Sequence, residues 1–245
     1  MRNIKLTIQY DGTKYQGWQR LGSTSNTIQQ KMESILNLFT KEKVELICSG
    51  RTDAGVHAEN AIANFKTNCT ASTEDIFHYC NTYMPKDIVI KKVEEVDENF
   101  HSRYNAKAKI YTYKICNNVF HDVFTRKYSY HIPTKLNINK MREGASFLIG
   151  EHDFKSFTAL KSKKKSTVRK IYSIDIMEVD GNIDMIFHGN GFLYKMVRIL
   201  SGTLIEIGLG NISPNSIPNL LSLKDRSESG PTAPAHGLFL TRVIY

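Results

Sequence analysis

Arg51 and Asp53 are the residues whose types and spacing first suggest chemistry. They belong to the stretch SGRTDAGVHA at residues 49–58, which follows a short apolar run at 44–48. Two glycines bracket the Arg-x-Asp, so the chain is expected to turn tightly there. A guanidinium beside a carboxylate keeps it ionised and holds it in one orientation. Such a carboxylate could be a nucleophile, an anchor for a polar ligand or part of a structural ion pair, and spacing alone favours the structural interpretation.

The composition is that of a folded protein with a basic surface. The 245 residues suffice for one large or two small domains, and 41% hydrophobic and 23% charged residues are ordinary values. The net charge of +9 suggests a polyanionic partner, most simply nucleic acid. The four cysteines have neither C-x-x-C nor zinc-ligand spacing, which predicts reduced thiols in a cytoplasmic protein. No signal-peptide core and no membrane-spanning apolar run is present, so we expect a soluble protein with no membrane partner.

The first hundred residues predict the element order β-α-β-β-α-β. Strict alternation predicts a half-buried first strand, and TIQQ at 27–30 has the form of a capping box that opens a helix with one apolar face. This is the split ferredoxin-like order. The predicted strands are 2–10, 44–48, 58–66 and 87–96, and the predicted helices are 27–40 and 73–83.

The remaining residues predict the same order again. Asn137 and Gly150 are good caps for a helix at 137–149, and Asp180-Gly181 is a strong hairpin signal. The result is an α+β fold of two pseudo-repeated halves, 1–103 and 104–245, with mostly antiparallel sheets that meet at a central cleft, where sites commonly lie. The other predicted elements are strands 107–116, 171–179, 182–188 and 238–244, a helix at 192–208 and a short inserted helix near 214–223.

Two further stretches suggest contact with RNA. KYQGWQR at 14–20 interleaves aromatic, basic and polar residues, which suits stacking on RNA bases, although Trp18 could equally fill the edge of the core. KSKKKS at 161–166, followed by Arg169-Lys170, gathers six positive charges in ten residues. Its Lys163, Lys164 and Lys165 would bind phosphates in a salt-sensitive manner, or simply form a solvated charged loop.

Together these motifs resemble those of the tRNA pseudouridine synthase A family. In chain order they are YDGT at 10–13, GWQ at 17–19, GRTDAGVHA at 50–58, FHSR at 100–103, KIYTY at 109–113, DFKSF at 153–157, NGFL at 190–193, MVR at 196–198, GTL at 202–204 and APAHGL at 233–238. The resemblance extends from residue 4 to residue 245. The chain departs from the family at Ser102, Tyr104 and Asn105, and has Arg20 in place of a common Gln. The changes at residues 102–105 affect contacts with RNA more than the chemistry, and Arg20 suits a basic groove that binds RNA.

The resemblance implies an isomerase that converts uridine to pseudouridine in the anticodon stem-loop of tRNA, around tRNA positions 38–40. Such an enzyme detaches uracil from C1′ of the ribose, turns the base and rejoins it through C5. No group enters or leaves, so no cofactor and no metal is implied, and the sequence contains no P-loop, G-x-G-x-x-G or His/Cys cluster. Asp53 matches the nucleophile, and an ionised aspartate needs no activating base. It could add to C1′, add to the pyrimidine or deprotonate C2′.

The resemblance assigns four more residues to the same site. Arg198 would pair with Asp53, and Tyr111 would stack on the uracil and take up the C5 proton. Leu238 would line the other side of the pocket. Arg51 would contact the RNA backbone and help to hold the nucleotide flipped out of its stack. Without the resemblance, Tyr111 would be interpreted as a core tyrosine of its strand.

These assignments place the catalytic Asp loop in residues 1–103 and the completion of the cleft in residues 104–245. His57 is interpreted as a structural, hydrogen-bonding residue. The alternatives are a paralogue that acts on other RNA uridines and a non-catalytic RNA-binding protein. The joint presence of the Arg-x-Asp turn, Tyr111 and Arg198 argues against the second alternative. Members of the family are homodimers in which one tRNA reaches across both subunits, so the resemblance also implies a homodimer.

Overall fold

Contacts along the chain define two compact units. The computed structural model describes residues 1–160 and 166–245. The first unit comprises Met1–Lys107 and Phe239–Tyr245, and the second comprises Ala108–Leu238. The C-terminal strand is therefore grouped with the N-terminal residues by its contacts, whereas the division of function between 1–103 and 104–245 stays a prediction.

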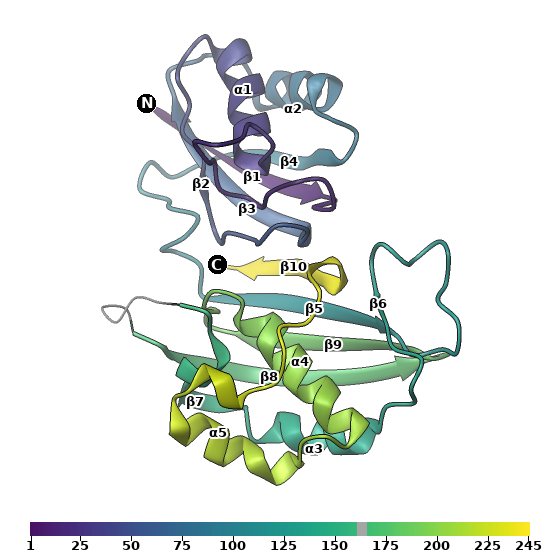
Figure 1. Cartoon of the computed structure of the whole chain (residues 1–245). Coiled ribbons are helices and arrows are strands. Elements are labelled where there is room, and N and C mark those ends of the chain that lie inside the picture. Colours follow the sequence, from purple (N-terminus) through teal and green to yellow (C-terminus); the bar gives the residue numbers. More distant parts are fainter. Residues whose placement is uncertain (161–165) are drawn as a thin grey trace. The chain divides into compact units, whose positions relative to one another are not determined.

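The first unit has the predicted β-α-β-β-α-β order, followed by the C-terminal strand (Figure 1). Alternation of buried and half-buried residues along the first strand places Ile4, Leu6 and Ile8 in the core, each fully buried. Thr27 caps the first helix with its side chain, and Ser72 and Asp75 form a capping box at the second. The elements are β1 (Arg2–Tyr10), α1 (Ile28–Thr40), β2 (Ile47–Cys48), β3 (His57–Thr67), α2 (Thr73–Tyr83), β4 (Ile88–Val96) and β10 (Leu238–Ile244).

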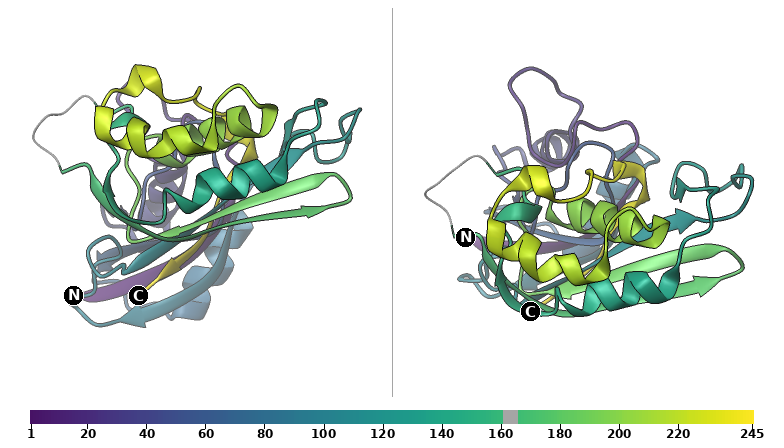
Figure 2. Two further views of the ribbon diagram at one scale, coloured as in Figure 1. Left: turned by 90° about the horizontal axis from the view of Figure 1, so that it is seen from below. Right: turned by 60° about the horizontal axis from the view of Figure 1, so that its bottom comes forward.

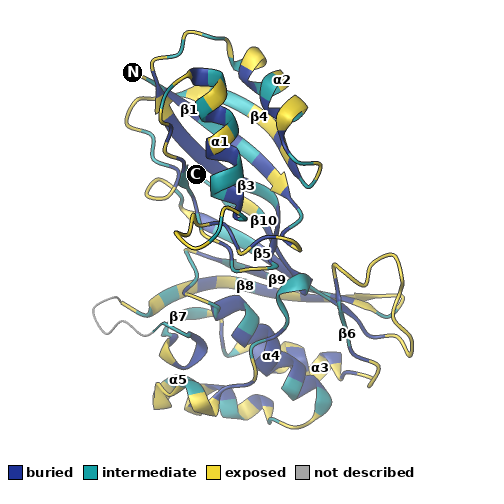
Figure 3. Ribbon diagram, turned by 45° about the horizontal axis from the view of Figure 1, so that its top comes forward, coloured by how far each residue is buried: buried dark blue, intermediate teal, exposed yellow. Residues whose placement is uncertain are grey.

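The sheet of this unit has β1 between β4 and β3, with antiparallel pairing on both sides. On the side away from β1, β3 pairs with two further strands, over two residues each. β2 is antiparallel to it at Asn64 and Ala63, and β10 is parallel to it at His57 and Ala58. The helices α1 and α2 pack beside one another and turn their buried residues towards the strands (Figure 3).

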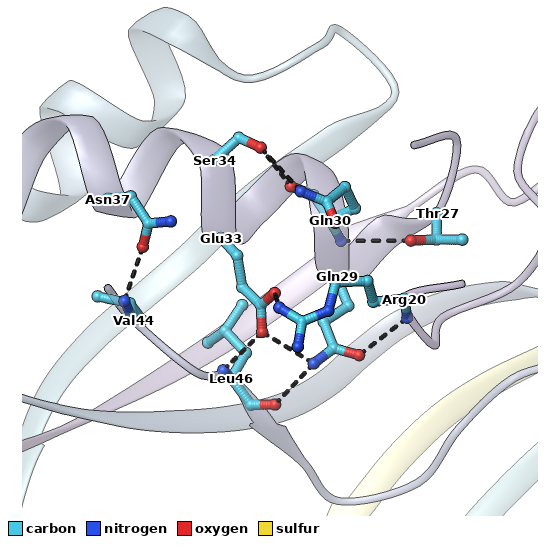
Figure 4. A network of polar contacts seen from close by, with 9 residues as sticks. All are labelled: Arg20, Thr27, Gln29, Gln30, Glu33, Ser34, Asn37, Val44 and Leu46. Atoms are coloured by element: carbon cyan, nitrogen blue, oxygen red, sulfur yellow. Dashed lines mark hydrogen bonds and ion pairs between the residues drawn. The ribbon is translucent and has the colours of Figure 1, made fainter. Parts of the chain in front are cut away.

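The predicted strand at 44–48 is wrong in its first half, because only Ile47 and Cys48 pair as a strand. The backbone groups before them bind side chains of α1 instead (Figure 4). The N–H of Val44 donates to Asn37 Oδ1 at 2.7 Å, and the N–H of Leu46 donates to Glu33 Oε1 at 3.0 Å. Val44 and Leu46 are nevertheless buried, which explains the apolar pattern of the segment.

The second unit is built on the antiparallel order β5-β9-β8-β7, with β6 added in parallel to β5. The helices α3, α4 and α5 lie on one face of this sheet (Figure 2). The predicted hairpin at Asp180-Gly181 is confirmed, since these two residues connect β8 to β9. The elements are β5 (Ala108–Cys116), β6 (Tyr130–His131), α3 (Ile138–Ser146), β7 (Gly150–Asp153), β8 (Val168–Val179), β9 (Asn182–Gly189), α4 (Met196–Leu209) and α5 (Ile217–Leu223).

The ends of two helices in this unit differ clearly from the prediction. The helix expected at 137–149 ends at Ser146, because the following N–H groups of Leu148 and Ile149 bind the carbonyls of Ala145 and Ser146 in tighter turns before β7 starts at Gly150. The helix expected at 192–208 starts only at Met196. The preceding residues 192–195 are not helical, and the carbonyl of Tyr194 accepts hydrogen bonds from the Thr158 hydroxyl and from the N–H of Ala159. The strands β6 and β7 are not predicted by the sequence pattern.

The predicted α+β class with mostly antiparallel strands is confirmed, since six strand pairs are antiparallel and two are parallel among those assigned a register. Within the described ranges, no helix combines the length and apolar character needed to cross a membrane. The cysteines Cys48, Cys69, Cys80 and Cys116 are free thiols.

Candidate active site

The Arg-x-Asp turn of the first unit connects β2 to β3 and is fixed along its backbone. Ser49 N–H donates to the carbonyl of Ile62 at 2.8 Å, and Val56 N–H closes the turn on the carbonyl of Asp53 at 3.2 Å. Between them, the hydroxyl of buried Thr52 is 2.7 Å from that of Tyr10, at the end of β1. A turn held at both ends and in its middle presents its remaining side chains in a defined direction.

The loop after β1 packs directly on this turn through backbone contacts. Trp18 N–H donates to the carbonyl of Thr52 at 3.1 Å. Gly12 and Gly17 lie so close that a Cβ atom at Gly12 would be 2.0 Å from the carbonyl oxygen of Val56, and one at Gly17 would be 2.7 Å from that of Thr52. Gly17 also has a positive φ of 91°. Only glycine allows the two backbones to approach to this distance.

The aromatic residues of the same loop are part of the core. Trp18 is 1% exposed and Tyr15 is 5% exposed, and the Tyr15 hydroxyl donates to Asp87 Oδ1 at 2.5 Å. The ring of Trp18 lies 6.0 Å from that of Tyr10. The suggestion that Trp18 stacks on RNA is therefore wrong, and the alternative, a tryptophan that fills the edge of the core, is correct.

Arg51 and Asp53 lie in this turn as the sequence predicted, with different exposures. Arg51 is exposed and Asp53 is half-buried, while Thr52 between them faces the core. The turn thus combines one accessible cation with a carboxylate whose backbone is held in place on both sides.

His57, the first residue of β3, has a structural environment, as predicted. It is 1% exposed, and its ring stacks on that of Phe239 at 4.7 Å. Its Nδ1 atom accepts the N–H of Gly12 at 3.0 Å and lies 3.1 Å from Asp11 Oδ1. His57 thus helps to hold the loop that contains Gly12 against the turn at residues 51–53.

Tyr111 lies in the second unit, in the middle of β5, and is 8% exposed. It is opposite Phe187 in the β5–β9 ladder, and its ring meets that of Phe192 edge-on at 5.3 Å. Two residues further along the strand, Tyr113 lies on the same face and is fully buried. The ring of Tyr111 is thus fixed by aromatic packing beside the NGFL motif at 190–193.

Arg198 projects from the first turn of α4 towards the segment 229–234. Its Nε donates to the carbonyl of Ala233 at 2.8 Å, and its own backbone carbonyl accepts the N–H of Ala233 at 3.0 Å. The hydroxyl of Tyr113 donates to the carbonyl of the next residue, Pro234, at 2.9 Å. These bonds fix the guanidinium of Arg198 and orient Tyr113 against the same segment.

The charge of Arg198 acts on two neighbouring groups of the second unit. Burial raises the pKa of Tyr113, and the positive charge of Arg198 works against that shift. Burial lowers the pKa of His236, and Arg198 lowers it further, while a hydrogen bond with the backbone of Ser129 works in the opposite direction. Both effects place Arg198 close to Tyr113 and His236, where its charge favours the neutral imidazole and opposes the effect of burial on the phenol.

The remaining predicted residues are placed as follows. Leu238 is the first residue of β10 and is 5% exposed. Lys163, Lys164 and Lys165 lie outside the described residues. The structure thus brings Arg51 and Asp53 together in the first unit, whereas Tyr111, Arg198 and Leu238 belong to the second. Their assembly into one pocket with Asp53 stays a prediction.

Several contacts that build the site leave no recognisable signal in the sequence. Tyr10 and Thr52 each belong to a motif, but they are 42 residues apart in the sequence, so their hydrogen bond could not be foreseen. Pro234 binds Tyr113 over 121 residues through its backbone carbonyl, which no side-chain pattern can reveal. Across residues 1–160 and 166–245, no three His, Cys, Asp or Glu side chains are arranged to hold a metal ion.

The fold and these two sets of residues define an α+β protein with an aspartate turn in one unit and an aromatic–arginine cluster in the other. A family model described as tRNA pseudouridine synthase matches residues 6–105 and 145–245, which is most of the chain. The chain belongs to the tRNA pseudouridine synthase family, and the resemblance found in its motifs is confirmed.

Full-length relatives agree with this assignment. The chain is 49% identical over 245 residues to "tRNA pseudouridine synthase A 2" of Bacillus cereus (strain ATCC 14579) and to "tRNA pseudouridine synthase A 1" of Clostridium tetani, with both chains covered completely in each case. A crystal structure of a Cbf5-Nop10-Gar1 complex is a distant match, with a TM-score of 0.40 and 15% identity over 97% of this chain and 48% of that chain.

Proposed function

We propose that this chain converts uridine to pseudouridine in the anticodon stem-loop of tRNA, around positions 38–40, with Asp53 as the nucleophile. Membership of the family makes the chain an isomerase that acts on tRNA. The observation that carries the more specific proposal is the turn at residues 51–53. There the one carboxylate of the GRTDAGVHA motif is half-buried on a backbone fixed by Thr52, Trp18 and Val56.

The reaction requires a nucleophile and precise positioning of that nucleophile against the uridine. The N1–C1′ bond of uridine breaks and a C5–C1′ bond forms, while C5 loses a proton and N1 gains one. An aspartate ionised at neutral pH can engage the sugar or the base directly. Because it needs no activating base, its contribution depends on orientation, and a fixed backbone provides that.

The aromatic–arginine cluster supplies the other groups of the proposal. Tyr111 is held edge-on by Phe192, so its ring can offer a flat surface to a uracil that has left its stack. In this scheme Tyr111 also takes up the proton from C5. Arg198, tied to Ala233, pairs with the carboxylate of Asp53, and Leu238 lines the opposite wall.

Binding of tRNA rests on positive charge. The chain carries a net charge of +9, and Arg51 is exposed next to the proposed nucleophile. In the proposal Arg51 contacts the RNA backbone beside the flipped nucleotide, and Lys163, Lys164 and Lys165 add phosphate contacts. Charge neutralisation of this kind releases counterions, so affinity should fall as salt rises.

The proposal includes a cytoplasmic homodimer, in which one tRNA contacts both subunits. It follows from the family resemblance and from cysteines that the sequence pattern suggests are kept reduced. Gel filtration with light scattering tests the dimer, and a monomer at the concentrations used for activity would contradict it.

Tritium release tests the reaction itself. Unmodified tRNA transcripts tritiated at uridine C5 are incubated with the protein, the released tritium is measured and the product positions are mapped. We expect release from the anticodon stem-loop, and no release with Asp53→Ala. Equal release by Asp53→Ala would refute the role of Asp53. Release from other positions would instead favour a paralogue with a different target.

A further inference from the structure

Glu33 is a buried charged residue in the middle of α1. Its side chain is 2% exposed, and a buried carboxylate is costly unless it is paired and hydrogen-bonded. Here it has three partners (Figure 4). Its Oε2 accepts from Arg20 Nη1 at 2.8 Å, and its Oε1 accepts from Gln29 Nε2 at 2.8 Å and from the N–H of Leu46 at 3.0 Å.

Gln29, one helical turn earlier, binds the same two residues. Its Oε1 accepts the N–H of Arg20 at 3.0 Å, and its Nε2 donates to the carbonyl of Leu46 at 3.3 Å. Two side chains of α1 therefore hold both backbone polar groups of Leu46 as well as the backbone and the guanidinium of Arg20. We call this arrangement of Arg20, Gln29, Glu33 and Leu46 the Glu33 clamp.

The two segments that the clamp joins are the ones that hold the turn at 51–53. On one side, Arg20 lies two residues after Trp18, whose N–H binds the carbonyl of Thr52. On the other side, Leu46 leads directly into β2, which pairs with β3 and continues into the turn. A shift of either segment relative to α1 would be passed to Thr52, and hence to Asp53.

We infer that Glu33 is a positioning residue for the catalytic turn, which it controls by clamping the segments at Arg20 and Leu46 to α1. The inference rests on the proposed function, since it assumes that Asp53 is the nucleophile. It also changes the interpretation of Arg20. The sequence suggested a cation suited to a basic RNA groove, whereas the structure shows its guanidinium bound to a buried carboxylate.

Asn37 provides a matched control on the same helix. Its Oδ1 accepts the N–H of Val44 at 2.7 Å, so it too ties α1 to the segment before β2. This bond does not involve the segment that contains Arg20 and Trp18. Loss of this bond should lower stability in a similar way, but Glu33 and Gln29 would still hold both backbone groups of Leu46, so the segment next to β2 should keep its place.

The experiment compares Glu33→Gln, Arg20→Ala and Asn37→Ala with the unchanged protein. In Glu33→Gln, one oxygen is replaced by an NH₂ group that must face a donor. Single-turnover tritium release at saturating protein measures the chemical step, and filter binding measures tRNA affinity. A displacement of about 1 Å can cost about a hundredfold in rate, so we expect Glu33→Gln to react about tenfold to a hundredfold more slowly. We expect Arg20→Ala to react more slowly too, with affinity for tRNA within about twofold in both variants, and Asn37→Ala to keep the original rate.

Amide hydrogen exchange of residues 49–56 gives a readout that does not depend on activity. Exchange there should be faster in Glu33→Gln and in Arg20→Ala, and unchanged in Asn37→Ala. If Glu33→Gln does not fold, the Arg20→Ala variant alone tests the inference. It removes a side chain that is 47% exposed and therefore disturbs the core less.

Three results would overturn the inference. One is a single-turnover rate for Glu33→Gln equal to that of Asn37→Ala, measured while the unchanged protein is active. Another is an Arg20→Ala variant that loses tRNA affinity but not rate. The third is unchanged exchange at residues 49–56. Absence of tritium release from the unchanged protein would refute the proposed function instead, and the exchange data would then still show whether the clamp holds the turn.

Discussion

Replacement of Gly12 by alanine should slow the reaction sharply, because the backbone of Gly12 lies against the turn that carries Asp53. A Cβ atom at Gly12 would be 2.0 Å from the carbonyl oxygen of Val56 and 2.6 Å from its carbonyl carbon. Real Cβ atoms are essentially never closer than 3.0 Å to such neighbours, so the two backbones must separate by at least 1.0 Å. Val56 closes the turn on the carbonyl of Asp53, and the displacement therefore reaches Asp53, the proposed nucleophile.

The expected loss in single-turnover rate for Gly12→Ala is about a hundredfold, the usual cost of a misplacement of about 1 Å. Overpacking should also lower the free energy of unfolding by about 1–3 kcal/mol. Gly22→Ala is the matched control, because a Cβ atom there would meet nothing within 4 Å. Single-turnover tritium release and urea denaturation measure the two effects. A folded Gly12→Ala variant that reacts within about twofold of Gly22→Ala would refute the idea that this contact positions the turn.

Three further outcomes are expected. Tyr113→Phe removes the bond to the Pro234 carbonyl and should lower the free energy of unfolding by about 1 kcal/mol, so an unchanged urea midpoint would contradict it. The pKa of His236 is lowered by burial and by Arg198, so the unfolded state binds the proton first as pH falls below the ordinary value of 6.5. The free energy of unfolding should therefore fall more between about pH 7.5 and 5.5 in the unchanged protein than in His236→Gln, and parallel curves would contradict this. Affinity for tRNA should weaken steeply with salt, and a salt-independent affinity would count against the basic surface.

The elements with local signals were predictable from the sequence. Thr27 caps α1, the Ser72–Asp75 capping box starts α2, and Asp180-Gly181 turns the β8–β9 hairpin, all from interactions within a few residues. Elements defined by distant partners were not. The strand β6 has two residues and exists only through its pairing with β5, and residues 44–46 bind side chains of α1 although they alternate like a strand.

The candidate site divides in the same way. Arg51 and Asp53 were identifiable because the motif around them is contiguous. Trp18 was ambiguous because its loop has the composition of an RNA contact, and burial at 1% exposure resolved it. Glu33 gave no signal, since a glutamate at the margin of an apolar helix face normally points to solvent. Its role depends on Arg20 and Leu46, which reach it only in the folded chain.

The central claim, that the carboxylate of Asp53 performs the isomerisation, is tested most directly by Asp53→Asn. This variant keeps the shape of the side chain and removes its charge and nucleophilicity. Single-turnover release of tritium from C5-labelled tRNA is measured together with tRNA affinity by filter binding. The account predicts that release is lost, by about a thousandfold or more, while affinity stays within about threefold. Release at the rate of the unchanged protein would contradict it.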